Sequence, residues 1–177
     1  METLQAIAKR KSTRKYLPKQ IPEKDLENIL FAGCAAPVAG GDWDTVQIIV
    51  IQNRDLLARM SRAGASKLRK RNSDPFYGAP TLILIATQIY CPYPFHAGQA
   101  NTACIGENMC IAATDLGLGS TYLTGFLPGF CEDESQVKEA GVADEFTPSA
   151  GILIGYPETE DDSVKVGIRT NIVHYIR

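Results

Sequence analysis

Short apolar runs alternate with amphipathic stretches along the chain. Three β-branched runs have the length of largely buried strands and a fourth leads into a turn; they are Thr45–Ile51, Thr81–Thr87, Ser149–Gly155 and Ser120–Gly125. Helical patterns cover residues 2–11, 22–36, 55–71, 98–116 and 129–140. From these elements we expect an α+β fold in which a mixed sheet is flanked by helices.

The helix predicted over residues 98–116 carries a stripe of small residues. Ala103, Gly106, Cys110 and Ala113 recur every three or four positions. Such a stripe lets the backbone of another helix approach closely. One compact sheet has no obvious surface on which this stripe and the C-terminal segment could both be buried. We therefore expect a partner subunit to provide that surface.

Length and composition fit one domain over residues 1–177, with 45% hydrophobic and 21% charged residues. Eighteen Lys and Arg against twenty Asp and Glu give a net charge of -2, which argues against a nucleic-acid binder that must neutralise many phosphates. Prolines and polar residues interrupt the long uncharged stretch over residues 75–106, so we expect no membrane span. The N-terminus has no apolar signal core, and we therefore expect a soluble cytoplasmic protein.

The cysteines are odd in number and irregularly spaced, which favours reduced thiols over a disulfide framework; they are Cys34, Cys91, Cys104, Cys110 and Cys131. The intervals between Cys91, Cys104 and Cys110 match no compact zinc or iron–sulfur pattern, so we expect buried small thiols at these three positions. His96 and His174 lack a second ligand at metal spacing, and we expect no metal site.

The run Arg10-Lys11-Ser12-Thr13-Arg14 is the most informative short motif. Arg10 and Arg14 are four apart, so on a helix and its immediate extension both guanidinium groups can converge on one anion, with the Ser12 hydroxyl as a further donor. A phosphate monoester suits this constellation. The alternative is that the cations only stabilise the helix dipole at the surface. The residues of this run alone leave both interpretations open.

The order of short segments along the rest of the chain resembles the nitroreductase family of flavoproteins. After the basic run come Cys34–Gly40, Tyr77–Pro80, Glu107–Met109, Gly117–Ser120, Gly155–Pro157 and Arg169. The resemblance extends from Ala6 to about Arg169 and rests on order and spacing, because each segment alone is common. It implies a three-layer sandwich around a mainly antiparallel sheet, in an intertwined homodimer whose residues 163–177 reach onto the partner subunit.

The resemblance also implies an FMN site. Its phosphate ligands would be Arg10, Ser12 and Arg14, with Lys11 beside them. Arg169 matches a late basic residue that closes on the same phosphate.

Two further segments match residues that contact the flavin ring in the family. Pro37 and Val38 would border the ring from the neighbouring subunit. Leu123, Thr124 and Gly125 match a segment that presents backbone N–H groups to the reactive flavin nitrogen.

The chain departs from the family after Pro37. Similar proteins commonly have Ser, Asn and Gln side chains there, which hydrogen-bond to the ring, whereas residues 38–44 are Val-Ala-Gly-Gly-Asp-Trp-Asp. We therefore expect backbone groups, water or Asp42 to meet the pyrimidine edge of a bound flavin. Trp43 either stacks near the flavin or packs on the edge of the core.

A flavin site needs no catalytic side chain, because the ring itself accepts and donates hydride. The protein binds the phosphate, orients the ring and places backbone donors near the nitrogen that becomes negative on reduction. The resemblance implies an FMN-dependent oxidoreductase that uses NADH or NADPH to reduce small electrophilic acceptors such as nitroaromatics or quinones, by ping-pong hydride transfer through flavin N5. The alternatives are a flavin-binding or storage protein without nicotinamide turnover, and a flavin-fragmenting or reductively dehalogenating relative.

Three other features have both a functional and a structural interpretation. The aromatic, uncharged loop Gln88–Gly98 either covers an aromatic acceptor or packs against the partner subunit. The basic cluster either attracts the phosphates of a nicotinamide cofactor or is a solvated helix face; it comprises Lys67, Arg69, Lys70 and Arg71. Gly117-Leu118-Gly119 follows a helix and lacks the third glycine of a dinucleotide fingerprint, so we expect no Rossmann site.

Overall fold

The computed structural model describes residues 1–68, 74–88, 97–159, 161, 163–165, 167 and 172–176. Its strands are β1 (Val46–Ile51), β2 (Thr81–Gln88), β3 (Gly119–Leu123) and β4 (Phe146–Gly155). Its helices are α1 (Thr3–Lys9), α2 (Glu23–Cys34), α3 (Arg54–Ala65), α4 (Ala97–Asp115), α5 (Leu127–Phe130) and α6 (Glu134–Glu139), with 3-10 turns η1 (Ala39–Gly41) and η2 (Trp43–Thr45). The α+β fold class is confirmed.

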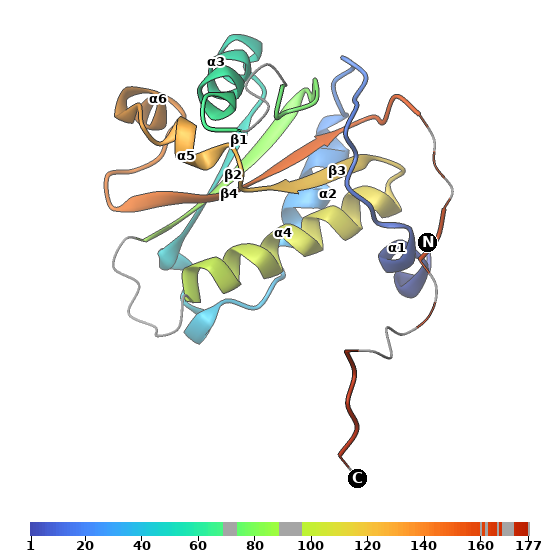
Figure 1. Ribbon diagram of the computed structural model, residues 1–177. Helices are drawn as coiled ribbons and strands as arrows, with labels where there is room; N and C mark the ends of the chain where they lie inside the picture. Colours follow the sequence, from blue (N-terminus) through green and yellow to red (C-terminus); the bar gives the residue numbers. More distant parts are fainter. Residues whose placement is uncertain are drawn as a thin grey trace.

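The strands form one sheet in the order β1-β2-β4-β3, and every neighbouring pair is antiparallel (Figure 1). The expected mainly antiparallel sheet is therefore confirmed for the described strands. Among the described residues, the one parallel pairing is an isolated bridge that joins Ser12 of the N-terminal segment to Ser120 at the free edge of β3. This bridge brings the N-terminal segment to the edge of the sheet.

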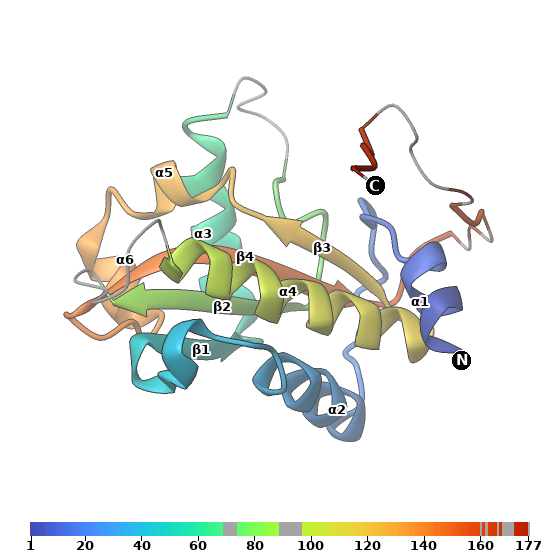
Figure 2. The same ribbon diagram turned by 90° about the horizontal axis from the view of Figure 1, so that it is seen from below.

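The sheet lies between two layers of helices. Figures 1 and 2 show α2 and α4 on one side and α3, α5 and α6 on the other. Successive β2 side chains point to opposite faces: Leu82 and Leu84 join the core beneath α3 and α5, whereas Ile83 and Ile85 join the core beneath α2 and α4. Because both faces are covered, β2 is an apolar run rather than an alternation of apolar and polar residues.

The small-residue stripe of α4 packs mainly within the chain. Gly106, Cys110 and Ala113 are buried, and a Cβ on Gly106 would lie 2.7 Å from the ring of Tyr122 on β3. These small residues let α4 settle onto its own sheet. The expectation that this stripe needs a partner subunit for burial was wrong for these three positions, although Ala103 is exposed.

The helix predicted over residues 129–140 is divided in two. α5 ends at Phe130, and the Asp133 carboxylate then caps α6 by accepting hydrogen bonds from the backbone N–H groups of Ser135 and Gln136. A cap of this kind begins a new helix rather than continuing the preceding one. The single-helix prediction was wrong for this reason.

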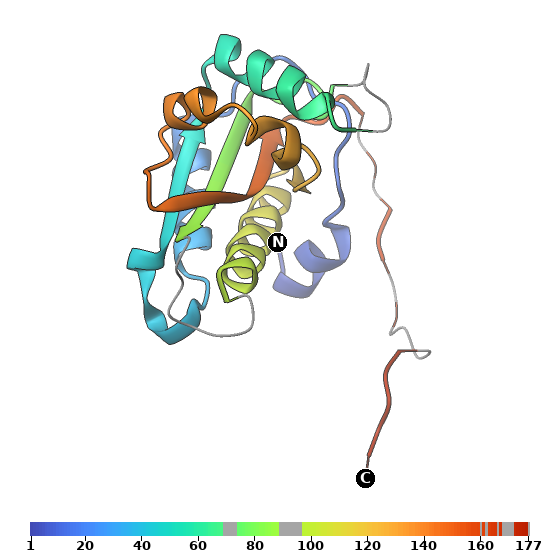
Figure 3. The ribbon, with the colours of Figure 1, turned by 60° about the vertical axis from the view of Figure 1, so that its left-hand side comes forward.

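The described C-terminal residues 172–176 lie apart from the helices and strands (Figures 1 and 3). Ile172 is 67% exposed and Ile176 is fully exposed. None of the helices in the described ranges has both the length and the hydropathy of a membrane-spanning segment.

Candidate functional site

The basic segment after α1 is fixed to the edge of the sheet. The backbone N–H of Thr13 donates a hydrogen bond of 2.9 Å to the carbonyl of Ser120 on β3. A Cβ on Gly119 would lie 2.6 Å from the Thr13 hydroxyl oxygen, so glycine allows the two segments to lie side by side. The side chains of residues 10–14 therefore project from a fixed backbone.

A cavity of about 550 Å³ opens beside this segment. Its wall includes the polar and basic side chains of Lys9, at the end of α1, and of Lys11, Ser12, Thr13, Arg14 and Lys15 in the segment that follows. Residues Thr114 and Gly117, at the carboxyl end of α4, line it as well. Several cations and a hydroxyl around one cavity attract an anion and offer the charge-assisted hydrogen bonds that a phosphate accepts.

Acidic residues that follow β4 already pair with part of this basic segment. Lys11 Nζ lies 2.8 Å from Asp161 Oδ2, and Lys15 forms an ion pair with Glu158. Hydrogen bonding from Lys11 holds the pKa of Asp161, which also lines the cavity, far below its usual range. Within the described ranges, the lining cations Lys9 and Arg14 have no carboxylate partner, so a phosphate would compete with an internal acid at Lys11 and Lys15 but not at these two.

Arg10 faces α4 rather than the cavity. Its Nε lies 3.2 Å from Glu107 Oε1, and its side chain does not line the cavity. α1 ends at Lys9, so the helical repeat that relates residues four apart does not run through Arg10 and Arg14. The structure thus gathers Lys11, Ser12 and Arg14 around one cavity and places the Arg10 guanidinium beside them, against Glu107.

The segment that carries Pro37 and Val38 lies at the opposite end of α4. The backbone N–H of Ala39 donates a hydrogen bond of 2.9 Å to Asn101 Oδ1, in the second turn of the helix. Asn101 and the cavity-lining Thr114 are thirteen residues apart, which corresponds to roughly 20 Å along a helix axis. Within one chain, the predicted ring-bordering segment is therefore too far from the cavity to contact the same small anion.

Leu123, Thr124 and Gly125 lie where β3 ends. Leu123 is its last residue, and Thr124 and Gly125 follow it as exposed positions before α5. Since β3 begins beside Thr13, one strand leads from the basic cavity to this turn. The predicted phosphate end and the predicted ring donors thus belong to one continuous edge of the molecule.

A sequence model described as "Nitroreductase family" matches residues 7–156. The chain belongs to the nitroreductase family. Among curated relatives, an Archaeoglobus fulgidus protein named "Putative NADH dehydrogenase/NAD(P)H nitroreductase" is 28% identical over 172 residues, covering 96% of this chain and 94% of that protein.

Solved structures share the nitroreductase fold over the whole chain. A Desulfitobacterium hafniense nitroreductase with bound FMN superposes with a TM-score of 0.86 at 21% identity, and each chain is covered completely. A Bacteroides fragilis nitroreductase with bound FMN has a TM-score of 0.83 at 25% identity, again with complete coverage.

Some of the predicted nitroreductase site lies outside the described residues. These positions are Arg169, residues 89–96 of the loop Gln88–Gly98, and Arg69, Lys70 and Arg71 of the basic cluster. The described member of that cluster, Lys67, forms a surface ion pair of 2.7 Å with Glu132.

The four described cysteines of this nitroreductase-family chain do not form a common metal site. Cys110 is buried, and burial raises the pKa of its thiol, so the thiol stays protonated at neutral pH. Cys104 is exposed, which corrects the expectation of a buried thiol, and Cys91 lies outside the described residues. Among the residues that the structure places, no three His, Cys, Asp or Glu side chains cluster as metal ligands.

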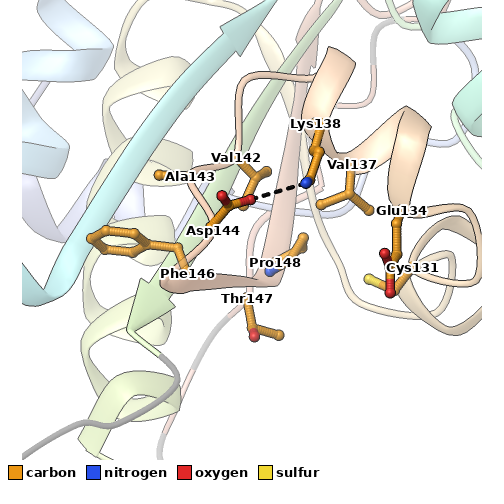
Figure 4. Close-up of a pocket in the computed structure, with 10 residues that line it drawn as sticks. All are labelled: Cys131, Glu134, Val137, Lys138, Val142, Ala143, Asp144, Phe146, Thr147 and Pro148. Carbon is orange, nitrogen blue, oxygen red and sulfur yellow. Dashed lines mark ion pairs between the residues drawn. The ribbon is translucent and has the colours of Figure 1, made fainter.

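A second cavity, of about 340 Å³, lies between α6 and the start of β4 (Figure 4). Its charged wall includes the Lys138–Asp144 ion pair of 3.3 Å, and Val137 and Phe146 also line it. None of the predicted site residues lies there, and its one lysine is already paired. The basic cavity is therefore the candidate nitroreductase site.

Sequence reasoning assigned no role to two side chains of α4, Asn101 and Glu107. Asn101 is only 4% exposed, and its Nδ2 has no acceptor among the described residues. A signal for it exists, because Asn101 lies four residues from the buried Ala97 and from the buried Ile105 and so interrupts an apolar helix stripe. Glu107 belongs to the segment Glu107–Met109 that carries the family resemblance, but nothing in the sequence indicated its ion pair with Arg10.

Proposed function

We propose that the chain is an FMN-dependent oxidoreductase that uses NADH or NADPH to reduce small electrophilic acceptors such as nitroaromatics or quinones. Family membership supports the class of reaction. The observation that carries the proposal for this chain is the basic cavity at the start of β3, with Lys11, Ser12 and Arg14 in its wall. Two FMN-bound structures of the same fold support the choice of flavin.

The residues of the cavity would hold the FMN phosphate. Ser12 and Arg14 donate hydrogen bonds to it, Lys11 adds a charge, and Arg10 and Arg169 complete the set. FMN, when bound, supplies hydride transfer between the nicotinamide and the acceptor. The chain's own contribution is to fix the phosphate at one end of β3 and to direct the ring along the strand toward the turn after Leu123.

We propose further that the working unit is a homodimer. Pro37 and Val38 lie at the far end of α4 from the cavity, so the neighbouring subunit would supply them to the ring. Exposed apolar side chains support an interface between copies: Leu4 on α1 is 79% exposed and Phe31 on α2 is 76% exposed. The C-terminal segment over residues 163–177 would reach onto the partner.

A second candidate function is flavin binding or storage without nicotinamide turnover. It is favoured by the loop after α2, which has no side-chain amide at residues 38–44 and turns through Gly40 and Gly41 at φ values of 64° and 70°. Fewer fixed donors at the pyrimidine edge would alter the flavin's redox potential.

Affinity for flavins tests the phosphate site directly. Arg14→Ala should weaken FMN binding about tenfold or more, because a hydrogen bond to a charged group contributes about 1.5 to 3 kcal/mol. Riboflavin, which has no phosphate, should bind the variant as it binds the wild type. The matched control is Arg62→Ala on the exposed face of α3. Unchanged FMN affinity in Arg14→Ala, measured by flavin fluorescence, would contradict the assignment.

Reduction under anaerobic conditions separates the two candidate functions. The FMN-loaded protein is mixed with NADH or NADPH in a sealed cuvette, and absorbance near the flavin maximum is followed. Bleaching supports the oxidoreductase, and a persistent yellow colour supports the storage protein. Recovery of intact FMN after a nitroaromatic or quinone is added distinguishes reduction of the acceptor from destruction of the flavin.

A further inference from the structure

We propose that Thr121 on β3 is a positioning residue that holds the basic segment in place for the flavin phosphate. The inference rests on the proposed FMN function and adds to it a side chain that does not itself line the cavity. Thr121 is buried, at 6% exposure, and acts through Thr13, which lines the cavity between Ser12 and Arg14. Its hydroxyl joins the segment to the sheet at that point.

Consecutive residues of β3 hold both polar groups of the Thr13 backbone. The Thr13 N–H donates a hydrogen bond of 2.9 Å to the carbonyl of Ser120, and the Thr121 hydroxyl donates one to the carbonyl of Thr13. A backbone held at its donor and at its acceptor cannot turn or slide along the strand edge without losing a bond. Ser12 and Arg14, on either side of Thr13, therefore start from fixed positions.

The Thr121 hydroxyl is the middle member of a chain of hydrogen bonds whose direction is determined. Tyr16 Oη lies 3.0 Å from Thr121 Oγ1. A hydroxyl has one proton and a carbonyl can only accept, so Thr121 gives its proton to Thr13 and accepts one from Tyr16. Burial raises the pKa of the Tyr16 phenol, so this donor keeps its proton at neutral pH.

A buried hydroxyl on a strand is unfavourable unless it is hydrogen-bonded, and valine fills nearly the same volume without that cost. Both the proton and the acceptor oxygen of Thr121 are used, and the two partners, Tyr16 and Thr13, belong to the N-terminal segment. The hydroxyl thus serves the segment that carries the proposed phosphate ligands.

Removing the hydroxyl would release the centre of the basic segment. The Thr13 carbonyl would lose its donor and turn toward water, and Ser12 and Arg14 would move with it. A phosphate would then have to order the segment when it binds, which lowers affinity, whereas a segment fixed in advance avoids that cost.

Two variants at one position separate the hydroxyl from the shape of the side chain. Thr121→Val removes the hydroxyl and keeps the branched shape, whereas Thr121→Ser keeps the hydroxyl and removes a methyl group. We expect the FMN dissociation constant to rise about fivefold in Thr121→Val and to stay within about twofold of the wild type in Thr121→Ser. Riboflavin, which has no phosphate, should bind both variants as it binds the wild type.

The matched control is Thr87→Val. Thr87 is also a buried strand threonine, and its hydroxyl is 2.7 Å from that of Ser149, toward the other end of the sheet. This variant removes a comparable hydrogen bond far from the basic segment. It should lower the free energy of unfolding and leave the preference for FMN over riboflavin unchanged.

The dissociation constants are measured by flavin fluorescence on the full chain, with circular dichroism and urea unfolding to verify folding. A preference for FMN that survives intact in Thr121→Val, or that falls equally in Thr121→Ser, overturns the role of the Thr121 hydroxyl alone. A wild type without that preference overturns the phosphate site and the role of Thr121 together.

Tyr16→Phe tests the same chain of hydrogen bonds from its other end, and it carries the test if Thr121→Val does not fold. It should weaken FMN binding about twofold and leave riboflavin binding unchanged. In the Thr121→Val background it should have no further effect on FMN affinity, because Tyr16 acts through Thr121. An FMN affinity that Tyr16→Phe alone leaves unchanged overturns the part of Tyr16.

Discussion

The backbone N–H of Ala39 donates a 2.9 Å hydrogen bond to the side-chain oxygen of Asn101. This bond joins the loop after α2 to α4 across 62 positions of the sequence. It fixes the orientation of the Asn101 amide, because only the oxygen can accept from an N–H group. The loop that lacks side-chain amides of its own is thus held by one supplied from a helix.

Asn101→Ala should free this loop. The Ala39 N–H would lose its acceptor, and the free energy of unfolding should fall by about 1 to 3 kcal/mol. Hydrogen exchange at the Ala39 amide should also become faster. Gln99→Ala, at an exposed position two residues earlier on α4, is the control and should change neither quantity. Equal exchange rates at Ala39 in the two variants would rule out the anchoring role.

Gly129→Ala should be strongly destabilising. A Cβ at this position of α5 would collide with the backbone carbonyl oxygen of Ala63 in α3, and a backbone atom cannot rotate away. We expect a loss of about 3 kcal/mol in the free energy of unfolding, measured with urea. Gly125→Ala is the matched control, since its Cβ would meet only Leu68 at 3.5 Å. Similar midpoints for the two variants would show that α3 and α5 separate easily.

Asn53→Ala should weaken the start of α3. The Asn53 side chain accepts hydrogen bonds of 3.0 Å from the backbone N–H groups of Asp55 and Leu56. Loss of such a cap costs about 1 kcal/mol, which for a chain of this size lowers the melting temperature by roughly 2 to 4 °C. Asn28→Ala, at an exposed interior position of α2, serves as the comparison in thermal unfolding. The expectation fails if Asn28→Ala lowers the melting temperature as much.

The cap of α6 should make stability depend on pH. Hydrogen bonds from the side chains of Ser135 and Gln136 lower the pKa of Asp133 to about 2, from an ordinary value of 3.8. The unfolded chain therefore takes up this proton first, so the stabilisation is present above pH 3.8 and is lost as the pH falls toward 2.

Asp133→Asn isolates this effect, because it keeps an acceptor oxygen and has no titrating group. The difference in unfolding free energy between wild type and variant should be constant at higher pH. Below about pH 4 the wild type should lose stability relative to the variant. Urea unfolding at several acidic pH values measures it. A difference that stays constant down to about pH 2 would contradict the lowered pKa.

The local pattern of apolar residues was sufficient to predict the strands and the apolar character of the core. The run Thr81–Thr87 predicts a buried strand, and the structure places β2 over Thr81–Gln88 with its side chains divided between two helix layers. This succeeds because the alternation of side chains along a strand is a property of the local backbone. The order of segments also sufficed to identify the family from sequence.

The position of each helix end, and the choice of which small residues lie at close contacts, depended on tertiary structure. The stripe on α4 predicted an approach to another helix, yet its Gly106 packs on Tyr122 of its own sheet, and close helix approaches occur at Gly33 of α2, against Met109, and at Gly129 of α5. A small residue in the sequence indicates only that a neighbour can approach closely at that position. Which element fills that space depends on how the layers stack, and no local pattern encodes that.

The same distinction applies to the basic site. The sequence determined that Arg10, Ser12 and Arg14 form a cationic segment after a short helix, because charge and helix length are local. Only the fold decided that Arg10 meets Glu107, 97 positions away, while Arg14 lines the cavity. Hydrogen bonds and ion pairs act over a few ångströms in space, and the chain brings such partners together only after α4 has packed beside β3.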